Sequence, residues 1–217
     1  IYSSDILGAG AGSLAVMGLL FVLSPQNALR LIAALGFAAA AVAWLECGHR
    51  PRWRAAALMV VAGLPFLLPE SWVAPVMSPY KGLSQILQIP QARVVEERSS
   101  PLGLVSVVES PGTPLRHAPG LSLNATAELP PQLGVFIDGE GMSALTRFDG
   151  RRESLAHLGQ MTSALPYRLL RQPRVLVLGA GAGADVLQAH YHGARQVDAV
   201  ELNPQVVDLV RRKFAAY

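Results

Sequence analysis

The sequence of 217 residues is long enough for one or two domains, with 51% hydrophobic and only 15% charged residues. The charged fraction is well below the usual quarter, and the first 80 residues carry few of the charges, which argues against a soluble domain there. The net charge of +3 comes with scattered arginines and no interleaved aromatic stripe, so no nucleic-acid partner is expected.

The cysteine content also excludes two kinds of structural site. A single cysteine, Cys47, cannot form an internal disulfide or a cysteine zinc cluster. It lies beside an apolar run and is expected to be an inert thiol. No metal site is predicted.

Three apolar runs within residues 1–70 are predicted to be transmembrane helices: Ile6–Leu23, Leu31–Leu45 and Ala55–Leu68. The first has 18 uncharged residues. At about 1.5 Å per residue it nearly spans a hydrocarbon core of about 30 Å. All three runs are apolar all round, which is not typical of surface helices. For the two shorter runs, a re-entrant segment or a buried helix is the alternative.

The first run contains Gly8 and Gly12, whose spacing lets helices approach closely in lipid; a Gly/Ala-rich span without that role is the alternative. A loop with Arg50, Arg52 and Arg54 is typical of a cytoplasmic face. With three full spans, this loop would place everything after residue 70 on the other face. The cofactor predicted below is cytosolic, so we expect one short run not to be a full span.

Residues 71–91 are predicted to be a linker, because prolines punctuate residues 65–90. Residues 92–150 are predicted to form a small antiparallel β domain, with short runs separated by Pro-, Gly- and Ser-rich turns. The runs are Arg93–Glu96, Leu104–Glu109 and Gly134–Ile137. His117 lies in a loop rich in Pro and Arg and is expected to be solvated rather than a ligand.

Residues 151–217 are predicted to begin a Rossmann-like nucleotide-binding domain. Its first element is expected to be a helix from Glu153 to Leu170, because apolar residues recur there at helical spacing and would form a buried stripe. The stripe is Leu155, Leu158, Met161 and Leu165. Met161 is expected in the core rather than in contact with a substrate.

An apolar strand, Arg174–Leu178, then runs into a glycine loop in which Gly179, Gly181 and Gly183 alternate with alanines. Glycine permits a tight turn and a close backbone approach to a ligand. Glu201 ends a second apolar strand 22 residues after Gly179, near the offset of about 20 expected for an acid that binds ribose hydroxyls. These four residues are the predicted cofactor-binding set.

Asp185 joins this set because it opens the helix after the glycine loop. The start of that helix offers free N–H groups and a positive dipole end to an anionic group. The loop matches enzymes that use S-adenosylmethionine, and also the looser dinucleotide pattern of NAD enzymes. A small β domain and a helix that leads directly into the glycine strand are unusual before an NAD domain, so this order favours the first class. A glycine turn without any ligand is the remaining alternative.

Several segments from about Tyr80 to Phe214 together resemble the spermidine synthase family, in particular its membrane-fused branch. The segments are Ala92–Ser100, Val105–Ser110, Val135–Gly139, Met161–Pro166, Val175–Gly183 and Val197–Glu201. The resemblance covers about 60% of the chain. It implies a β domain followed by a Rossmann-like domain and a cofactor that is S-adenosylmethionine or its decarboxylated form. The implied reaction is transfer of an alkyl group to an amine, as in polyamine biosynthesis.

The sequence also departs from that family. A Tyr-Gln pair of the family is replaced by Leu102-Gly103, a His-Glu pair by Gly159-Gln160, a Gln by Met142 and the Asp of the glycine loop by Ala182. The cradle for the cofactor is retained, while side chains that hold the aminopropyl donor and the diamine are replaced. The family's catalytic Asp would lie beyond Tyr217, so the catalytic residue is unknown and the chain is interpreted as a fragment of a longer protein.

The sequence therefore predicts a transferase in a bacterial inner membrane, with its soluble domain in the cytoplasm. It would move an aminopropyl or methyl group to an amine or another small acceptor. The expected partners are that acceptor and the lipid bilayer, and association into a homo-oligomer is left open. The alternatives are an NAD-linked oxidoreductase and a non-catalytic membrane sensor that binds a nucleoside.

Overall fold

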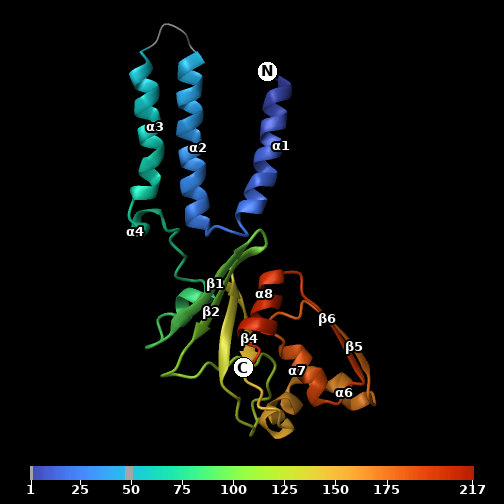
Figure 1. Cartoon of the computed structure of the whole chain (residues 1–217). Coiled ribbons are helices and arrows are strands. Elements are labelled where there is room, and N and C mark those ends of the chain that lie inside the picture. The colour runs from blue at the N-terminus through green and yellow to red at the C-terminus, as the bar shows by residue number, and fades with distance from the viewer. Residues whose placement is uncertain (1, 47–50) are drawn as a thin grey trace. The chain divides into compact units, whose positions relative to one another are not determined.

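The computed structural model describes residues 2–46 and 51–217, so the predictions for Cys47 and Arg50 lie outside the described residues. The chain divides into two compact units. One is Ile1–Val76 with Ser99–Pro101, and the other is Met77–Arg98 with Leu102–Tyr217. Figure 1 shows the order of their elements. The units are described separately below.

The first unit contains four helices: α1 (Tyr2–Leu19), α2 (Pro25–Glu46), α3 (Arg52–Leu67) and the short α4 (Glu70–Val73). The helices α2 and α3 pack side by side and bury alanines, among them Ala41 and Ala62 (Figure 1). The guanidinium of Arg30 on α2 donates a hydrogen bond of 3.0 Å to the carbonyl of Leu68, just after α3. Small side chains and one basic cap therefore hold this pair together.

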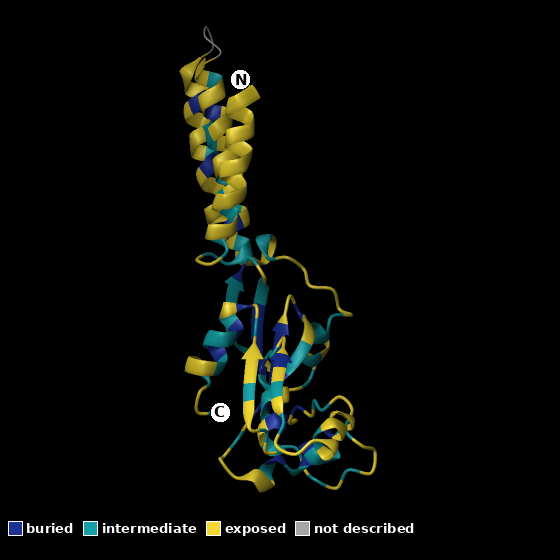
Figure 2. Ribbon diagram, turned by 90° about the vertical axis from the view of Figure 1, so that its right-hand side faces the viewer, coloured by how far each residue is buried: buried dark blue, intermediate teal, exposed yellow. Residues whose placement is uncertain are grey.

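The apolar surface of these helices is largely exposed (Figure 2). Among the described residues, α2 is the one helix both long and apolar enough to cross a membrane by length and composition. Only 11% of its apolar window is buried, so packing within the described chain does not account for its composition. A signal sequence would pass the same test, and three spans are not confirmed.

The helix limits differ from the prediction because a turn interrupts the first apolar run. The helix α1 ends at Leu19 instead of continuing to Leu23, and α2 begins six residues before the expected Leu31, at Pro25. Ser24 accepts a 3.4 Å hydrogen bond from the backbone N–H of Asn27, and Pro25 takes the first helical position. A polar cap followed by proline starts a helix irrespective of hydropathy. The longest helix is therefore the second.

The second unit contains the short helix α5 (Gly82–Ile86) and the predicted small antiparallel sheet, which is confirmed. Its strands lie in the order β1-β2-β3-β4, and the pairs β2–β3 and β3–β4 are antiparallel. The strands are β1 (Arg93–Ser100), β2 (Gly103–Glu109), β3 (Gln132–Ile137) and β4 (Glu140–Thr146). The sequence pattern missed β4, which follows β3 through a tight turn at Asp138 and Gly139, both with positive φ.

A continuous helix from Glu153 to Leu170 is wrong. The chain instead forms a 3₁₀ helix η1 (Arg152–Gln160), a second 3₁₀ turn η2 (Thr162–Ala164) and the short helix α6 (Leu165–Leu169). Between them Met161 is extended and pairs with Leu121 in an isolated bridge. The carbonyl of Gln160 accepts a hydrogen bond from the backbone N–H of Ser122, in the loop before β3. In a continuous helix this carbonyl would instead accept from an N–H of the helix itself.

A βαβ segment follows: β5 (Arg174–Leu178), α7 (Ala184–Tyr191) and β6 (Gln196–Val200), then α8 (Pro204–Asp208) and one π-helical turn η3 (Leu209–Lys213). The strands β5 and β6 are parallel, with Leu178 opposite Val200. Val177 is buried, but Leu176 and Leu178 are 62% and 75% exposed. One face of this apolar strand is therefore uncovered in the described chain.

The antiparallel sheet packs directly on the parts of the βαβ segment that form its glycine loop and α8. Their shared core includes Val107 and Val135 from the sheet, Ala182 from the loop, and Val206 and Leu209 after β6. Because the loop is part of this core, its position depends on the sheet.

Ion pairs reinforce the same packing. Arg98 on β1 pairs with Asp208 on α8 and, at 3.1 Å, with Glu96. Glu96 also lies 3.3 Å from the Lys213 ammonium. Burial by itself raises the pKa of Glu96, but the hydrogen bonds and charges of Arg98 and Lys213 outweigh it and hold this pKa below its ordinary value of 4.5.

We expect Glu96→Gln to lower the free energy of unfolding of the detergent-solubilised chain by about 1 kcal/mol at pH 7. Because the folded pKa is depressed, this contribution is complete above pH 4.5 and is lost as the pH falls through the folded pKa. Urea unfolding at several pH values measures it. Glu128→Gln, at an exposed glutamate without an ion pair among the described residues, is the control. A difference that grows below pH 4.5 contradicts the account.

Candidate functional site

The glycine loop lies at the carboxyl end of β5 and is fastened to the end of β6. The N–H groups of Gly179 and Ala180 both donate to the carbonyl of Val200, at 2.9 and 3.0 Å. Gly179, Gly181 and Gly183 have φ values of 75°, 52° and 94°, in the left-handed region that favours glycine. The alternating glycines therefore meet a conformational need at each position, and Gly183 serves as the N-cap of α7.

The loop also touches β4 closely at Gly181. A Cβ atom on Gly181 would lie 2.7 Å from the Ser143 hydroxyl oxygen. That hydroxyl accepts a hydrogen bond of 2.9 Å from the backbone N–H of Ala182. Ser143 is thus a supporting residue of the loop, and the sequence pattern missed it because it missed β4.

Glu201 lies against the loop, as expected for the acid after the second strand. One carboxylate oxygen accepts from the N–H of Gly181 at 2.8 Å, and the other accepts from the N–H of Asn203 at 2.8 Å. Asn203 in turn caps α8 by accepting from Gln205 at 3.0 Å. The structure therefore brings Glu201 and the glycine loop together at the ends of two parallel strands.

These residues line a cavity of about 340 Å³, which we call the loop cavity. One wall is Gly181, Gly183 and Glu201, and most of the rest is apolar. The apolar members include Leu145, Phe148, Val207, Val210 and Phe214. An apolar pocket with a few convergent polar groups is typical of a small-molecule site. This one would suit a flat apolar ring joined to a group that donates hydrogen bonds to a carboxylate.

Asp185 lies elsewhere. It is exposed in the first turn of α7 and lines a second cavity of about 310 Å³, which we call the histidine cavity. The two cavities are neighbours because Thr146 and Leu187 line both. Of the five predicted cofactor residues, the structure brings Gly181, Gly183 and Glu201 onto one cavity, with Gly179 beside them in the loop and Asp185 on the next.

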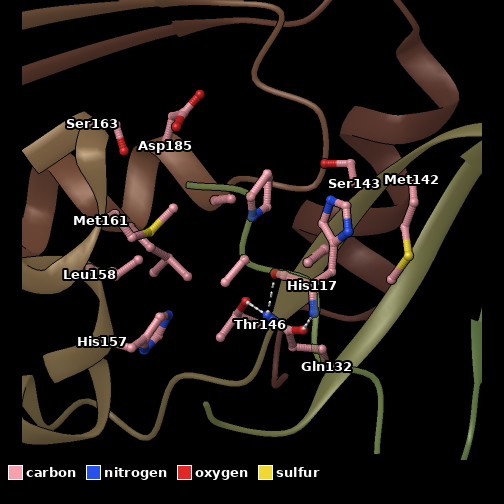
Figure 3. A pocket seen from close by; sticks show the side chains of 15 residues that line it. His117, Gln132, Met142, Ser143, Thr146, His157, Leu158, Met161, Ser163 and Asp185 are labelled. Carbon is pink, nitrogen blue, oxygen red and sulfur yellow. Dashed lines mark hydrogen bonds between the residues drawn. The ribbon is translucent and has the colours of Figure 1, made fainter. Parts of the chain in front are cut away.

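The histidine cavity contains residues that the sequence pattern did not assign (Figure 3). His117 was expected in a solvated loop, but it is half-buried on the cavity wall. Gln132 at the start of β3 holds its backbone by accepting from His117 N at 2.7 Å and donating to His117 O at 3.1 Å. Met161, expected in the core, is half-buried and also lines this cavity.

His157 on η1 is the most buried polar member of the cavity wall, with 2% of its surface exposed. Burial lowers its pKa, so the imidazole is neutral at pH 7. Leu155 and Leu158 of the expected stripe are buried in η1, but the 3₁₀ helix also buries His157, which no sequence signal marked. Among the described residues, no group of three or more His, Cys, Asp or Glu could hold a metal ion.

The positions that depart from the spermidine synthase pattern have mostly structural contacts. Gln160 accepts hydrogen bonds from the N–H groups of Thr126 and Ala127 at 3.0 and 3.4 Å, and so holds the loop before β3. Ala182 is buried in the core beneath the glycine loop. Two of these positions also line cavities, Met142 the histidine cavity and Ala182 the loop cavity.

Comparisons with protein-family models, curated proteins and solved structures gave no match to this chain. The resemblance to spermidine synthases therefore stays a prediction, and a function can be inferred only from the geometry of the two cavities.

We expect Gly181→Ala to destabilise the chain more than Gly179→Ala. Both alanines would have positive φ, which costs roughly 1–2 kcal/mol. Only the one at position 181 also meets Ser143, whereas a Cβ at position 179 meets open space. Thermal unfolding in detergent measures the difference, and Gly181→Ala with Ser143→Gly should recover part of it. An equal decrease in thermal stability for the two single variants would contradict the close contact between position 181 and Ser143.

Proposed function

We propose that residues 77–217 bind S-adenosylmethionine or its decarboxylated form and transfer a methyl or aminopropyl group to an amine or other small acceptor. The observation that carries the proposal is the meeting of Glu201 with the glycine loop on one apolar cavity. Glycine loop, helix and acid follow one another at the carboxyl ends of two parallel strands, where open α/β sheets bind ligands. On this proposal the βαβ segment is the start of a Rossmann-like domain.

The residues present fit an adenosyl group. The carboxylate of Glu201 would accept hydrogen bonds from ribose hydroxyls, and its present bond to Gly181 shows that it reaches the loop. Apolar side chains such as Val207 and Phe214 would cover the adenine ring. The N-terminus of α7, with Gly183 as its cap, suits the carboxylate of S-adenosylmethionine, a group that the decarboxylated form lacks.

When bound, the sulfonium supplies an alkyl carbon whose bond to sulfur breaks as a bond to the acceptor forms, with the electron pair remaining on sulfur and a proton leaving the acceptor. The chain's part is to bind, orient and exclude water. Strict polyamine synthesis is not proposed, since the family's side chains that hold the aminopropyl donor and the diamine are replaced at Leu102-Gly103, Met142, Gly159-Gln160 and Ala182.

We expect calorimetric titration of the full chain in detergent micelles to show binding of S-adenosylmethionine or its decarboxylated form, and none of NAD. Glu201→Gln should weaken that binding about tenfold or more, because a hydrogen bond to a charged group contributes roughly 1.5–3 kcal/mol. Glu153→Gln, at an exposed glutamate on η1, should leave it unchanged. Binding of NAD alone would favour an oxidoreductase. Binding of none of the three would overturn both enzyme proposals.

We also propose that the helical unit anchors the chain in the membrane, with residues 77–217 in the cytoplasm. The exposed apolar surface of α2 supports the anchor, and the cytosolic location of the proposed cofactor supports the orientation. The small residues Gly8 and Gly12 on α1 have open space around them, as a surface that packs in lipid requires.

Expressed in a bacterium, the chain should stay with the membrane through alkaline carbonate washing. Protease added to spheroplasts should leave residues 77–217 intact and should degrade them after detergent lysis. A cytosolic and a periplasmic marker protein control for leakage and for access. Release by carbonate would contradict the anchor, and digestion in intact spheroplasts would contradict the orientation.

A further inference from the structure

The histidine cavity has an unused hydrogen-bonding atom at its wall. The Nδ1 atom of His157 is buried and has no hydrogen-bond partner among the described residues. Buried polar atoms in folded proteins are nearly always paired, because an unpaired one has lost its hydration without a replacement hydrogen bond. A neutral imidazole presents one N–H donor and one lone-pair acceptor, so its free nitrogen can bond a hydroxyl or an amine in either tautomer. This atom needs an explanation.

On one wall of the cavity, polar groups at the two ends are separated by apolar side chains, while His117, Gln132, Ser143 and Thr146 line the wall across from it. In Figure 3, Asp185 and Ser163 lie at one end and His157 at the other, with Met161 and Leu158 between. The hydroxyl of Ser163 donates to Gln188 at 2.9 Å and is therefore engaged. The exposed carboxylate of Asp185 makes no ion pair or hydrogen bond with any described residue. Asp185 thus offers an unpaired carboxylate and His157 an unpaired ring nitrogen, and a ligand that spans the cavity between them can use both.

We propose that the histidine cavity binds an amino alcohol, with Asp185 holding its ammonium group and the free Nδ1 of His157 bonding its hydroxyl. The charges of the side chains that line the cavity indicate the chemical class of the ligand. Asp185 is the only carboxylate among the residues that line the described cavity, so one cationic group is matched at the open end. A second ammonium beside a neutral, buried His157 would lose hydration without gaining an opposite charge. The volume of about 310 Å³ suits a small organic molecule.

The position of the cavity gives this ligand a role. Because Thr146 and Leu187 line both cavities, a molecule bound there lies next to the glycine loop and its proposed cofactor. The amino alcohol would then be the acceptor of the alkyl group, an assignment that rests on the proposed function. Binding of the amino alcohol itself does not rest on it.

The probes are 6-amino-1-hexanol, hexylamine and 1,6-diaminohexane, titrated into the full chain in detergent micelles with and without S-adenosylmethionine. We expect 6-amino-1-hexanol to bind about tenfold more tightly than the other two probes, because one satisfied buried hydrogen bond changes the affinity by about this factor. His157→Leu should abolish this preference. His157→Asn, whose amide can also bond a hydroxyl, should keep most of it. His190→Asn, at an exposed histidine on α7, is the matched control.

The variant Asp185→Asn tests the contact with the ammonium group independently of the contact with the hydroxyl group. It should weaken binding of all three amines alike and leave the preference for 6-amino-1-hexanol unchanged. Wild type that does not distinguish the probes, or a preference that survives in His157→Leu, overturns the inference. If His157→Leu does not fold, the comparison of probes in wild type, His157→Asn and Asp185→Asn still decides. Binding of 6-amino-1-hexanol without any binding of S-adenosylmethionine would overturn the proposed function alone.

Discussion

The contact between β4 and the glycine loop is the constraint on which both cavities depend. The loop can lie against the strand only because position 181 has no side chain, since a Cβ atom there would meet the Ser143 hydroxyl at 2.7 Å. The same hydroxyl accepts from Ala182, and Glu201 accepts from Gly181 on the other side. Backbone N–H groups of the loop are thus fixed from two elements that are distant in sequence, which sets the walls of the loop cavity and of its neighbour.

Packing and charge maintain this contact together. The apolar side chains that β2, β3 and α8 share with Ala182 supply a common core, in which burial of each large side chain contributes roughly 1.5–3 kcal/mol. The ion pairs of Glu96, Arg98, Asp208 and Lys213 join the strand to the helix at the edge of that core. They add less energy because they are partly exposed, but they fix the register of α8 against β1.

The two cavities differ in what they can bind. The loop cavity is apolar with one carboxylate, Glu201, already within hydrogen-bonding distance of the loop. The histidine cavity has separate polar ends at Asp185 and His157. A donor and an acceptor of an alkyl group need adjacent sites, and the shared walls at Thr146 and Leu187 provide that adjacency. Met142, one of the positions that depart from the spermidine synthase pattern, lines the histidine cavity, whereas Ala182 lines the loop cavity.

The sequence by itself determined what depends on local pattern. The strand before Gly179, the glycine loop and the acid at Glu201 are set by neighbours within a few residues, and each lies where the pattern indicated. Short runs between Pro-, Gly- and Ser-rich turns likewise indicated three strands of the small sheet. The cap at Ser24-Pro25 was a local signal too, but hydropathy obscured it.

Only the tertiary structure decided which side chains meet. The helix expected from Glu153 is broken because Met161 pairs with Leu121, a partner that no local pattern reveals. Ser143 supports the loop across 39 residues of chain, Asp185 faces a different cavity from Glu201, and His157 became buried beside it. Helical and strand periodicity report which face of one element is apolar. They carry no information on which other element covers that face, and the contacts that form the cavities are of this second kind.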